Sequence, residues 1–101
     1  MTRQTARLIR GVMKQYPPMY EQLDDPIAVI ALHEDGQIHP LRFRWNGQAY
    51  HVGRVTGHWV VHEGESKHHH YTALCEKSGV FELCYDAQHI AWRLRSVYLD
   101  G

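Results

Sequence analysis

The sequence predicts a mainly β domain in which about six antiparallel strands form a meander that closes into a small barrel or a bent roll, with one N-terminal α-helix. Three observations support this fold class. Apolar segments rich in β-branched residues follow one another from residue 27 to the end of the chain. Clusters of turn-forming residues separate these segments about every ten residues. Helical periodicity is confined to the start of the chain.

Length and composition indicate one globular domain. The chain has 101 residues, of which 44% are hydrophobic, which suits a single domain with a modest core. No segment reaches the ~20 apolar residues that cross a bilayer, and the basic N-terminus lacks an apolar signal core. We therefore expect a cytoplasmic protein that does not contact membranes. Its two cysteines are too few for a disulfide framework, so both are expected to be free thiols.

Residues 1–16 are predicted to form an amphipathic, basic helix. At about 100° per residue the basic side chains fall in one stripe, while apolar side chains occupy the other side. The stripe consists of Arg3, Arg7, Arg10 and Lys14. Pro17 and Pro18 end the helix, and residues 17–26 are interpreted as a linker to a barrel-like domain spanning residues 27–101.

Residues 27–33 and 38–45 are the first two predicted strands, separated by a turn at residues 34–36. Asn46-Gly47 then predicts a type I′ hairpin turn, because both central positions of that turn need positive φ. This turn fixes the register of the hairpin. One face carries the pairs Trp45 with Gln48, Phe43 with Tyr50 and Leu41 with Val52. The opposite face carries Arg42, Arg44 and His51.

The second half of the chain continues the β pattern. One long strand is predicted over residues 48–62, and Gly53 and Gly57 within it indicate bulges or a sharp bend. Turns at residues 64–66, 77–79 and 86–88 separate the remaining strands. These strands are predicted at residues 67–76, 80–85 and 90–99. Successive short strands of this kind are typical of an antiparallel meander.

The spaced aromatic residues and turns of residues 38–100 resemble those of an uncharacterised bacterial β-domain. The resemblance rests on the segments 40–52 and 79–86, on Trp59, and on Trp92 and residues 97–100. Members of that family occur as small stand-alone proteins, and similar sequence is found at the C-terminal end of ImuB-type relatives of Y-family DNA polymerases. The resemblance implies the fold and a link to DNA damage tolerance, but it supplies no catalytic residues. The predicted helix lies outside it, and residues 68–70 are histidines where the family commonly has basic or aromatic residues.

A basic segment in the middle of the chain suggests contact with nucleic acid. No acidic residue lies between Asp35 and Glu63. The candidate contacts are Arg42, Arg44, Arg54 and His51, joined by the helical stripe Arg3, Arg7, Arg10 and Lys14. Small β-barrels bind single strands by combining phosphate contacts with base stacking. The predicted register directs the neighbouring aromatic residues into the core, which leaves phosphate contact to the arginines. A formal net charge of zero argues against strong attraction of the whole molecule to bulk nucleic acid.

The histidine run 68–70 and the two cysteines raise the question of a metal site. Adjacent strand residues point to opposite faces, so at most His68 and His70 share one face. The weak candidate set is His69, Cys75 and Cys84, but no spacing typical of zinc ligands selects it. We therefore expect no metal and no other cofactor. Cys75 or Cys84 with a histidine, or Glu82 with Asp86, are possible catalytic pieces, but none has a diagnostic spacing, so an enzyme is not expected.

Two function classes remain. The first is a non-catalytic module that binds single-stranded or double-stranded nucleic acid, in the context of DNA damage tolerance that the resemblance implies. The alternative is a protein-interaction or homodimerisation module that uses exposed aromatic residues or an unpaired sheet edge and makes no nucleic-acid contact. Salt dependence of binding would separate the two classes.

Overall fold

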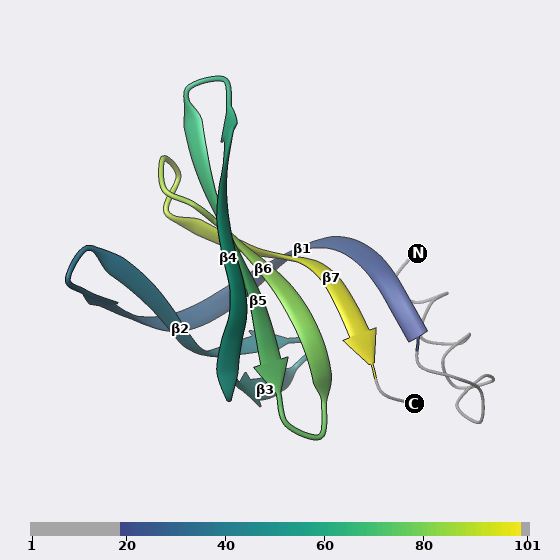
Figure 1. The fold of residues 1–101 in the computed structure, drawn as a ribbon. Coiled ribbons are helices and arrows are strands. Elements are labelled where there is room, and N and C mark those ends of the chain that lie inside the picture. Colours follow the sequence, from purple (N-terminus) through teal and green to yellow (C-terminus); the bar gives the residue numbers. More distant parts are fainter. Residues whose placement is uncertain (1–18, 100–101) are drawn as a thin grey trace.

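The computed structural model describes residues 19–99, which form one antiparallel sheet of seven strands (Figure 1). The strands are β1 (Met19–Glu34), β2 (Gln37–Trp45), β3 (Gln48–His51), β4 (Arg54–Glu63), β5 (Ser66–Cys75), β6 (Gly79–Asp86) and β7 (Ala91–Leu99). Their order across the sheet is β3-β2-β1-β7-β6-β5-β4. The mainly β meander is therefore confirmed, with one strand more than expected. The predicted helix and its stripe Arg3, Arg7, Arg10 and Lys14 lie outside the described residues.

β1 begins earlier than the sequence predicts and takes part in two pairings. Its first part, residues 19–27, pairs with β7, and its second part, residues 28–34, pairs with β2. Residues 19–26, interpreted as a linker, are thus strand. Half-buried and exposed residues alternate from Glu21 to Ile30, as a strand with one covered face requires. Pro26 is tolerated because β1 has a paired neighbour on one side only at this position.

The strand predicted over residues 48–62 is divided into β3 and β4 by Val52 and Gly53. Gly53 donates its backbone N–H to the carbonyl of Leu74 at 2.8 Å. At this point the chain stops pairing with β2 and begins to pair with β5. A second irregularity lies between Val55 and Gly57, where a bulge was expected. The break at Val52 and Gly53 accounts for the seventh strand.

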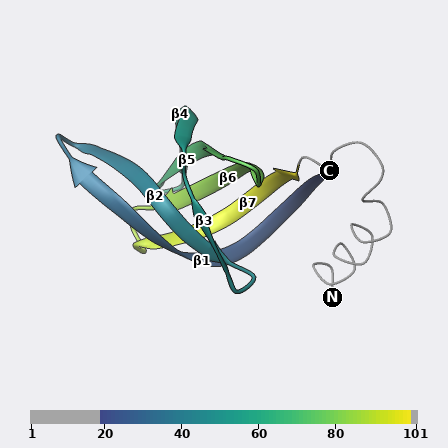
Figure 2. The same cartoon turned by 90° about the horizontal axis from the view of Figure 1, so that it is seen from below.

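The sheet bends strongly but does not close into a barrel (Figure 2). β3 and β4 are its two edge strands and do not pair with each other. The alternation of direction across seven antiparallel strands makes β3 and β4 run the same way. Parallel neighbours need a crossover of a dozen or more residues, which the two-residue link cannot supply. The observed architecture is therefore the bent, open form of the predicted fold.

The core lies on the inner face of the bend, where the β2–β3 hairpin packs over β6. Phe81 of β6 is fully buried and stands with its ring centroid 5.2 Å from that of Phe43 and 4.9 Å from that of Tyr50. The other buried members of this core are Trp45, Tyr71, Ala73, Cys75, Leu83, Tyr85, Leu94 and Val97. Aromatic residues from β2, β3 and β6 thus hold the two halves of the sheet together.

The Asn46-Gly47 turn has the predicted geometry, with φ of 54° at Asn46 and 73° at Gly47. The register that follows from it is confirmed, since Trp45 pairs with Gln48 and Phe43 with Tyr50. Leu41 departs from the expected inner face. The carbonyl of Leu41 accepts a hydrogen bond from the Val52 N–H, but the side chain is 47% exposed. An irregularity in the β1–β2 pairing, where Ile30 pairs with Arg42 and Ala31 with Pro40, turns Leu41 outward.

Two hairpins project from the body of the sheet in Figure 1: β1–β2, in blue, and β4–β5, in green. In the sheet order β7 and β6 lie between these hairpins, and β3 lies at the edge beyond β2. The described residues include no helix of the length and apolarity that crossing a membrane requires.

Candidate functional site

Arg42, Arg44 and His51 lie together on the outer face of the β2–β3 hairpin, and we call this set the cationic face. Two cross-strand rows position it. Arg42 pairs with Ile30 on one side and His51 on the other, and Arg44 pairs with Ala28 and Ala49. All three members of the cationic face are exposed. The outward direction of these side chains follows from the Asn46-Gly47 turn, which sends the alternate residues Phe43 and Trp45 inward.

The arginines of the cationic face have no acidic partner among residues 19–99. Neither Arg42 nor Arg44 forms an ion pair with a described residue, and their neighbours in the two rows are apolar or histidine. Arg42 and Arg44 both line a hollow of about 220 Å³. It is lined by Ala28, Val29, Ile30, Arg42, Phe43, Arg44 and Ala49. The small alanine side chains leave the Arg44 side chain open to an approaching anion.

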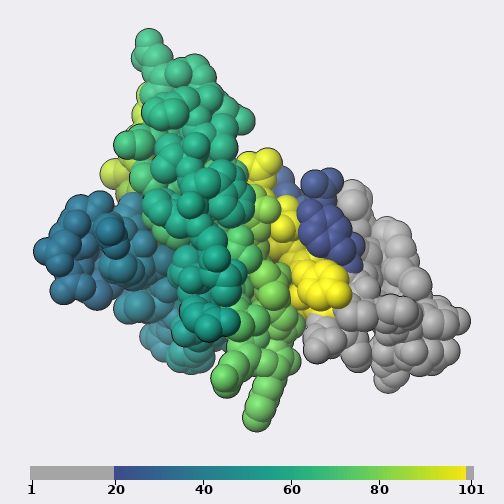
Figure 3. Space-filling model, viewed as in Figure 1, coloured from purple at the N-terminus to yellow at the C-terminus, as the bar shows by residue number. Residues whose placement is uncertain are grey.

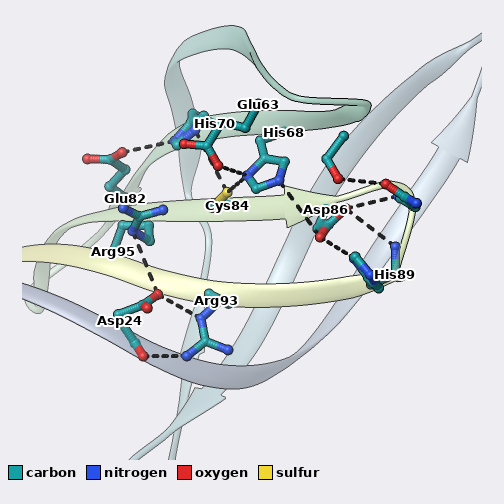
Figure 4. Close-up of polar contacts among 12 residues, drawn as sticks. Asp24, Glu63, His68, His70, Glu82, Cys84, Asp86, His89, Arg93 and Arg95 are labelled. Atoms are coloured by element: carbon teal, nitrogen blue, oxygen red, sulfur yellow. Dashed lines mark hydrogen bonds and ion pairs between the residues drawn. The ribbon is translucent and has the colours of Figure 1, made fainter.

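Arg93 and Arg95 show the opposite situation on β7. Arg93 donates from Nε to Asp24 Oδ1 at 2.6 Å and from Nη2 to the Asp24 carbonyl at 2.6 Å. Arg95 Nε lies 3.8 Å from the same carboxylate. One aspartate on β1 therefore forms ion pairs with both arginines (Figure 4). In contrast, Arg42 and Arg44 are charges that residues 19–99 leave without an ion pair.

Arg54 is exposed at the start of β4, three residues after His51, and forms no ion pair with the described part of the chain. It belongs to a different strand pair, because Arg54 is opposite Leu74 of β5. The structure thus brings Arg42, Arg44 and His51 onto one hairpin face and places Arg54 on β4, the other edge strand of the sheet. The cationic face carries no Phe, Tyr or Trp side chain, because the hairpin register directs Phe43, Trp45 and Tyr50 to the other face.

A polar cluster surrounds Cys84 on the outer face of β5, β6 and β7 (Figure 4), and it brings Cys84 together with histidines, one of the pairings that the sequence offered. His70 and Cys84 are directly opposite each other, and Cys84 Sγ lies 3.8 Å from His70 Nε2 and 3.9 Å from His68 Nδ1. Glu82 Oε2 is 3.1 Å from His70 Nδ1. Ser96 donates its hydroxyl to Glu82 Oε1 at 3.2 Å. Glu82 therefore links three strands.

The Cys84 cluster has the order carboxylate, imidazole, thiol that nucleophilic cysteines use, but its environment disfavours that chemistry. The Cys84 residue is only 4% exposed. Burial raises the pKa of its thiol above the ordinary value, while the nearby Arg95 acts in the opposite direction. A protonated and covered thiol is a poor nucleophile. These contacts support a structural role for the cluster, in which the buried polar groups satisfy one another.

The metal candidates His69, Cys75 and Cys84 are not brought together. His69 and Cys75 share the inner face of β5, whereas Cys84 pairs with His70 on the outer face. The sheet itself separates the thiol of Cys84 from the other two side chains. Within residues 19–99, no group of three or more histidine, cysteine, aspartate or glutamate side chains is arranged to hold a metal ion. The three candidates do not form a site, because the side chain of Cys84 lies on the opposite face of the sheet from those of His69 and Cys75.

A cleft of about 710 Å³ lies between the tip of the β1–β2 hairpin and the β4–β5 hairpin. His33 and His39 line it from one hairpin, and His58, His69 and Tyr71 line it from the other. The His58 ring stacks on Tyr71 at a centroid distance of 4.6 Å, and His58 Nε2 lies 3.4 Å from His69 Nδ1. Burial, followed by the nearby His58 and Lys67, lowers the pKa of His69. Sequence reasoning missed this cleft because its walls come from hairpins that are far apart in the chain.

Comparisons with protein-family models, with curated proteins and with solved structures found no match for this chain. The resemblance to the β-domain of ImuB-type polymerase relatives therefore stays a prediction.

Proposed function

We propose that this protein is a non-catalytic binding module whose cationic face contacts the phosphates of nucleic acid, in a DNA transaction such as damage tolerance. The observation that carries the proposal is the pairing state of the arginines. Arg42 and Arg44 are exposed and have no ion pair within residues 19–99, whereas Asp24 pairs with Arg93 and Arg95. Guanidinium groups match phosphate geometry and bind it through paired hydrogen bonds.

The shape of the cationic face favours phosphate over base recognition. It lies on the two strands β2 and β3, and the hairpin's aromatic residues Phe43, Trp45 and Tyr50 pack against Phe81 in the core. Bases therefore find no exposed Phe, Tyr or Trp ring of this hairpin to stack on, and binding is expected to depend weakly on sequence. The zero net charge of the chain limits long-range attraction, so affinity should be modest.

The test is fluorescence anisotropy with short labelled single-stranded DNA, double-stranded DNA and RNA over a series of salt concentrations near neutral pH. Phosphate contact by two arginines predicts that log Kd rises with log salt with a slope of about 2. The double variant R42E/R44E should lose binding by at least about tenfold at low salt. Absence of binding by the unmodified protein at low salt would contradict the proposal.

The matched control is the double variant K67E/K77E, which changes net charge by the same amount. Lys67 and Lys77 are exposed but lie on β5 and in the β5–β6 turn, away from the cationic face. The control should bind within about twofold of the unmodified protein. If it loses as much affinity as R42E/R44E, net charge and not the cationic face governs binding, and the proposal fails.

A further inference from the structure

β4 is a long edge strand that nothing in the described part of the chain covers on its free side. Only β5 pairs with it. Nine of its ten residues are exposed, with Gly57 as the half-buried exception, and the exposed set includes Val55, Trp59, Val60 and Val61. Figure 3 shows the atoms of β4 on the front surface of the molecule. The strand contains neither proline nor lysine, the residues that commonly block edge-to-edge pairing.

We propose that two copies of this chain form a homodimer by antiparallel pairing of β4 with β4. We derive the pairing by counting the positions of β4 that have a partner on β5. This count leaves out Thr56, which has no partner because the register shifts between Val55 and Gly57. Nine positions of β4 are paired with β5, and Trp59 is the fifth of them, counted from either end. A twofold axis perpendicular to the sheet at Trp59 therefore pairs each of these nine positions of one copy with one of the nine positions of the other.

This register places opposite charges at both ends of the interface. Arg54 is the first paired position and Glu63 is the last, so Arg54 of each copy lies directly opposite Glu63 of the second copy. Both side chains are on the outer face of β4, because Arg54 is opposite Leu74 and Glu63 is opposite Ser66, residues of the same parity as His70. Arg54 forms no ion pair with residues 19–99, and the Glu63 side chain is 66% exposed, with His68 Nδ1 3.7 Å from its carboxylate in the same chain. Opposite charges directly across an antiparallel pair stabilise it.

The inner positions of the same register are also compatible. Trp59 lies opposite Trp59 on the twofold axis, and Val61 lies opposite Gly57, whose missing side chain leaves room. On the inner face, His58 is opposite Val60 and Val55 is opposite His62. No like charges face each other. This charge complementarity, which needs no second protein, is the reason for assigning a second copy as the occupant of the edge.

The dimer goes beyond the proposed function and does not depend on it. It assigns Arg54 to the interface and leaves phosphate contact to Arg42 and Arg44 of each copy. Two cationic faces in one particle would let a single nucleic-acid strand engage both. The dimer is tested without nucleic acid, so its failure and the failure of phosphate binding are distinguishable.

The first experiment is a symmetric crosslink. In this register the two Trp59 Cα atoms are about 4.5 to 5.5 Å apart, within the range that a disulfide spans. The variant W59C should therefore form a disulfide dimer under mild oxidation, while Cys75 and Cys84 are buried and should not react. The matched control is V61C on the same strand and face, because the two copies of residue 61 are about 13 Å apart along the strands. A V61C crosslink as efficient as that of W59C would overturn the register.

The second experiment keeps all wild-type packing and reverses exposed charges. Sedimentation equilibrium should give twice the 11.8 kDa chain mass for the unmodified protein at micromolar concentration. R54E alone and E63R alone should each weaken the dimer by about tenfold, since each places like charges together at two sites. The double variant R54E/E63R restores opposite charges and should recover the dimer. A chain that stays at 11.8 kDa at high protein concentration, or a double variant weaker than both single ones, would overturn the proposal.

Discussion

The indole Nε1 of Trp45 donates a hydrogen bond to Asp25 Oδ2 at 2.9 Å. This contact joins the end of β2 to the irregular part of β1, where the register shifts between Gln22 and Asp25. Trp45 is 5% exposed, so its N–H has little access to water. The hydrogen bond therefore fixes the position of the β2–β3 hairpin, and with it the direction of the cationic face.

Asp25→Ala is expected to lower the free energy of unfolding by about 1–3 kcal/mol, because it leaves a buried N–H without its acceptor. Asp25→Asn keeps an acceptor oxygen and should cost clearly less. Urea denaturation followed by tryptophan fluorescence measures both. Equal losses in the two variants would mean that the carboxylate charge, and not the acceptor, is what Trp45 needs.

Gly79 is expected to be the least replaceable glycine of the turns. Its φ is 135°, and a Cβ at this position would overlap the Tyr98 carbonyl oxygen of β7. Gly79→Ala should lower stability by about 3 kcal/mol or more, through backbone strain and displacement of β7. Gly47→Ala is the control, because Gly47 also has positive φ but no atom within 4 Å of its added Cβ. The control should lose only about 1 kcal/mol in the same thermal or urea unfolding measurement.

Two acidic residues with ion pairs should differ in their effect on stability. Glu82 holds His70 Nδ1 at 3.1 Å and the Ser96 hydroxyl at 3.2 Å, and both of these residues are buried. Glu82→Ala is expected to cost about 1–3 kcal/mol because two buried polar groups lose their partner. Asp24→Ala removes an exposed pair with Arg93 and should cost less than about 1 kcal/mol. A larger loss for Asp24→Ala than for Glu82→Ala would contradict this ranking.

Stability should fall in alkaline solution because of two buried groups. Burial raises the pKa of Cys75 from 9.0 to about 11 and that of Tyr71 from 10.0 to about 12. Each group ionises more easily in the unfolded chain, so the stability present at neutral pH declines from pH 9 to 11 for Cys75 and from 10 to 12 for Tyr71. For Cys75 the full decline is about 2–3 kcal/mol. Urea titrations at several pH values measure it.

Removing either group should remove its share of the alkaline decline. Cys75→Ala should flatten the curve between pH 9 and 11, and Tyr71→Phe between pH 10 and 12, whatever stability each variant loses at neutral pH. Tyr98→Phe, at an exposed tyrosine, is the control and should follow the unmodified protein. An unchanged slope in Cys75→Ala would show that its thiol ionises alike in the folded and unfolded chains.

Patterns of a few neighbouring residues predicted the parts of the fold that depend on turn type and on the alternation of side chains between the two faces of a strand. Asn46-Gly47 set the hairpin register correctly, which placed Phe43 inward and Arg42 outward. The shared face of His68 and His70 also followed from strand alternation. These inferences succeeded because positive φ and side-chain parity are properties of a few neighbouring residues.

The remaining features depend on distant parts of the chain. The acidic, proline-containing segment 19–26 is a strand because it pairs with β7. No pattern within the segment itself indicates that pairing. The Cys84 cluster needs the β5–β6 register, in which Cys75 is opposite Gly79. The sequence placed this turn at residues 77–79, one position late, and so missed the pair His70 and Cys84. The positive φ at Lys77 and Gly79 marks the true turn.

The pairing of β1 with β7 also has a consequence for the order of folding. It joins Met19 to Leu99, nearly the two ends of the described chain, and Arg93 to Asp24 across 69 residues. The hairpins between consecutive strands can form while the chain is still being synthesised, because their contacts are local. β1 gains its second neighbour only when the final strand has left the ribosome. Until then the first half of β1 is an unprotected edge, which makes the pairing of β7 with β1 the step that completes the sheet.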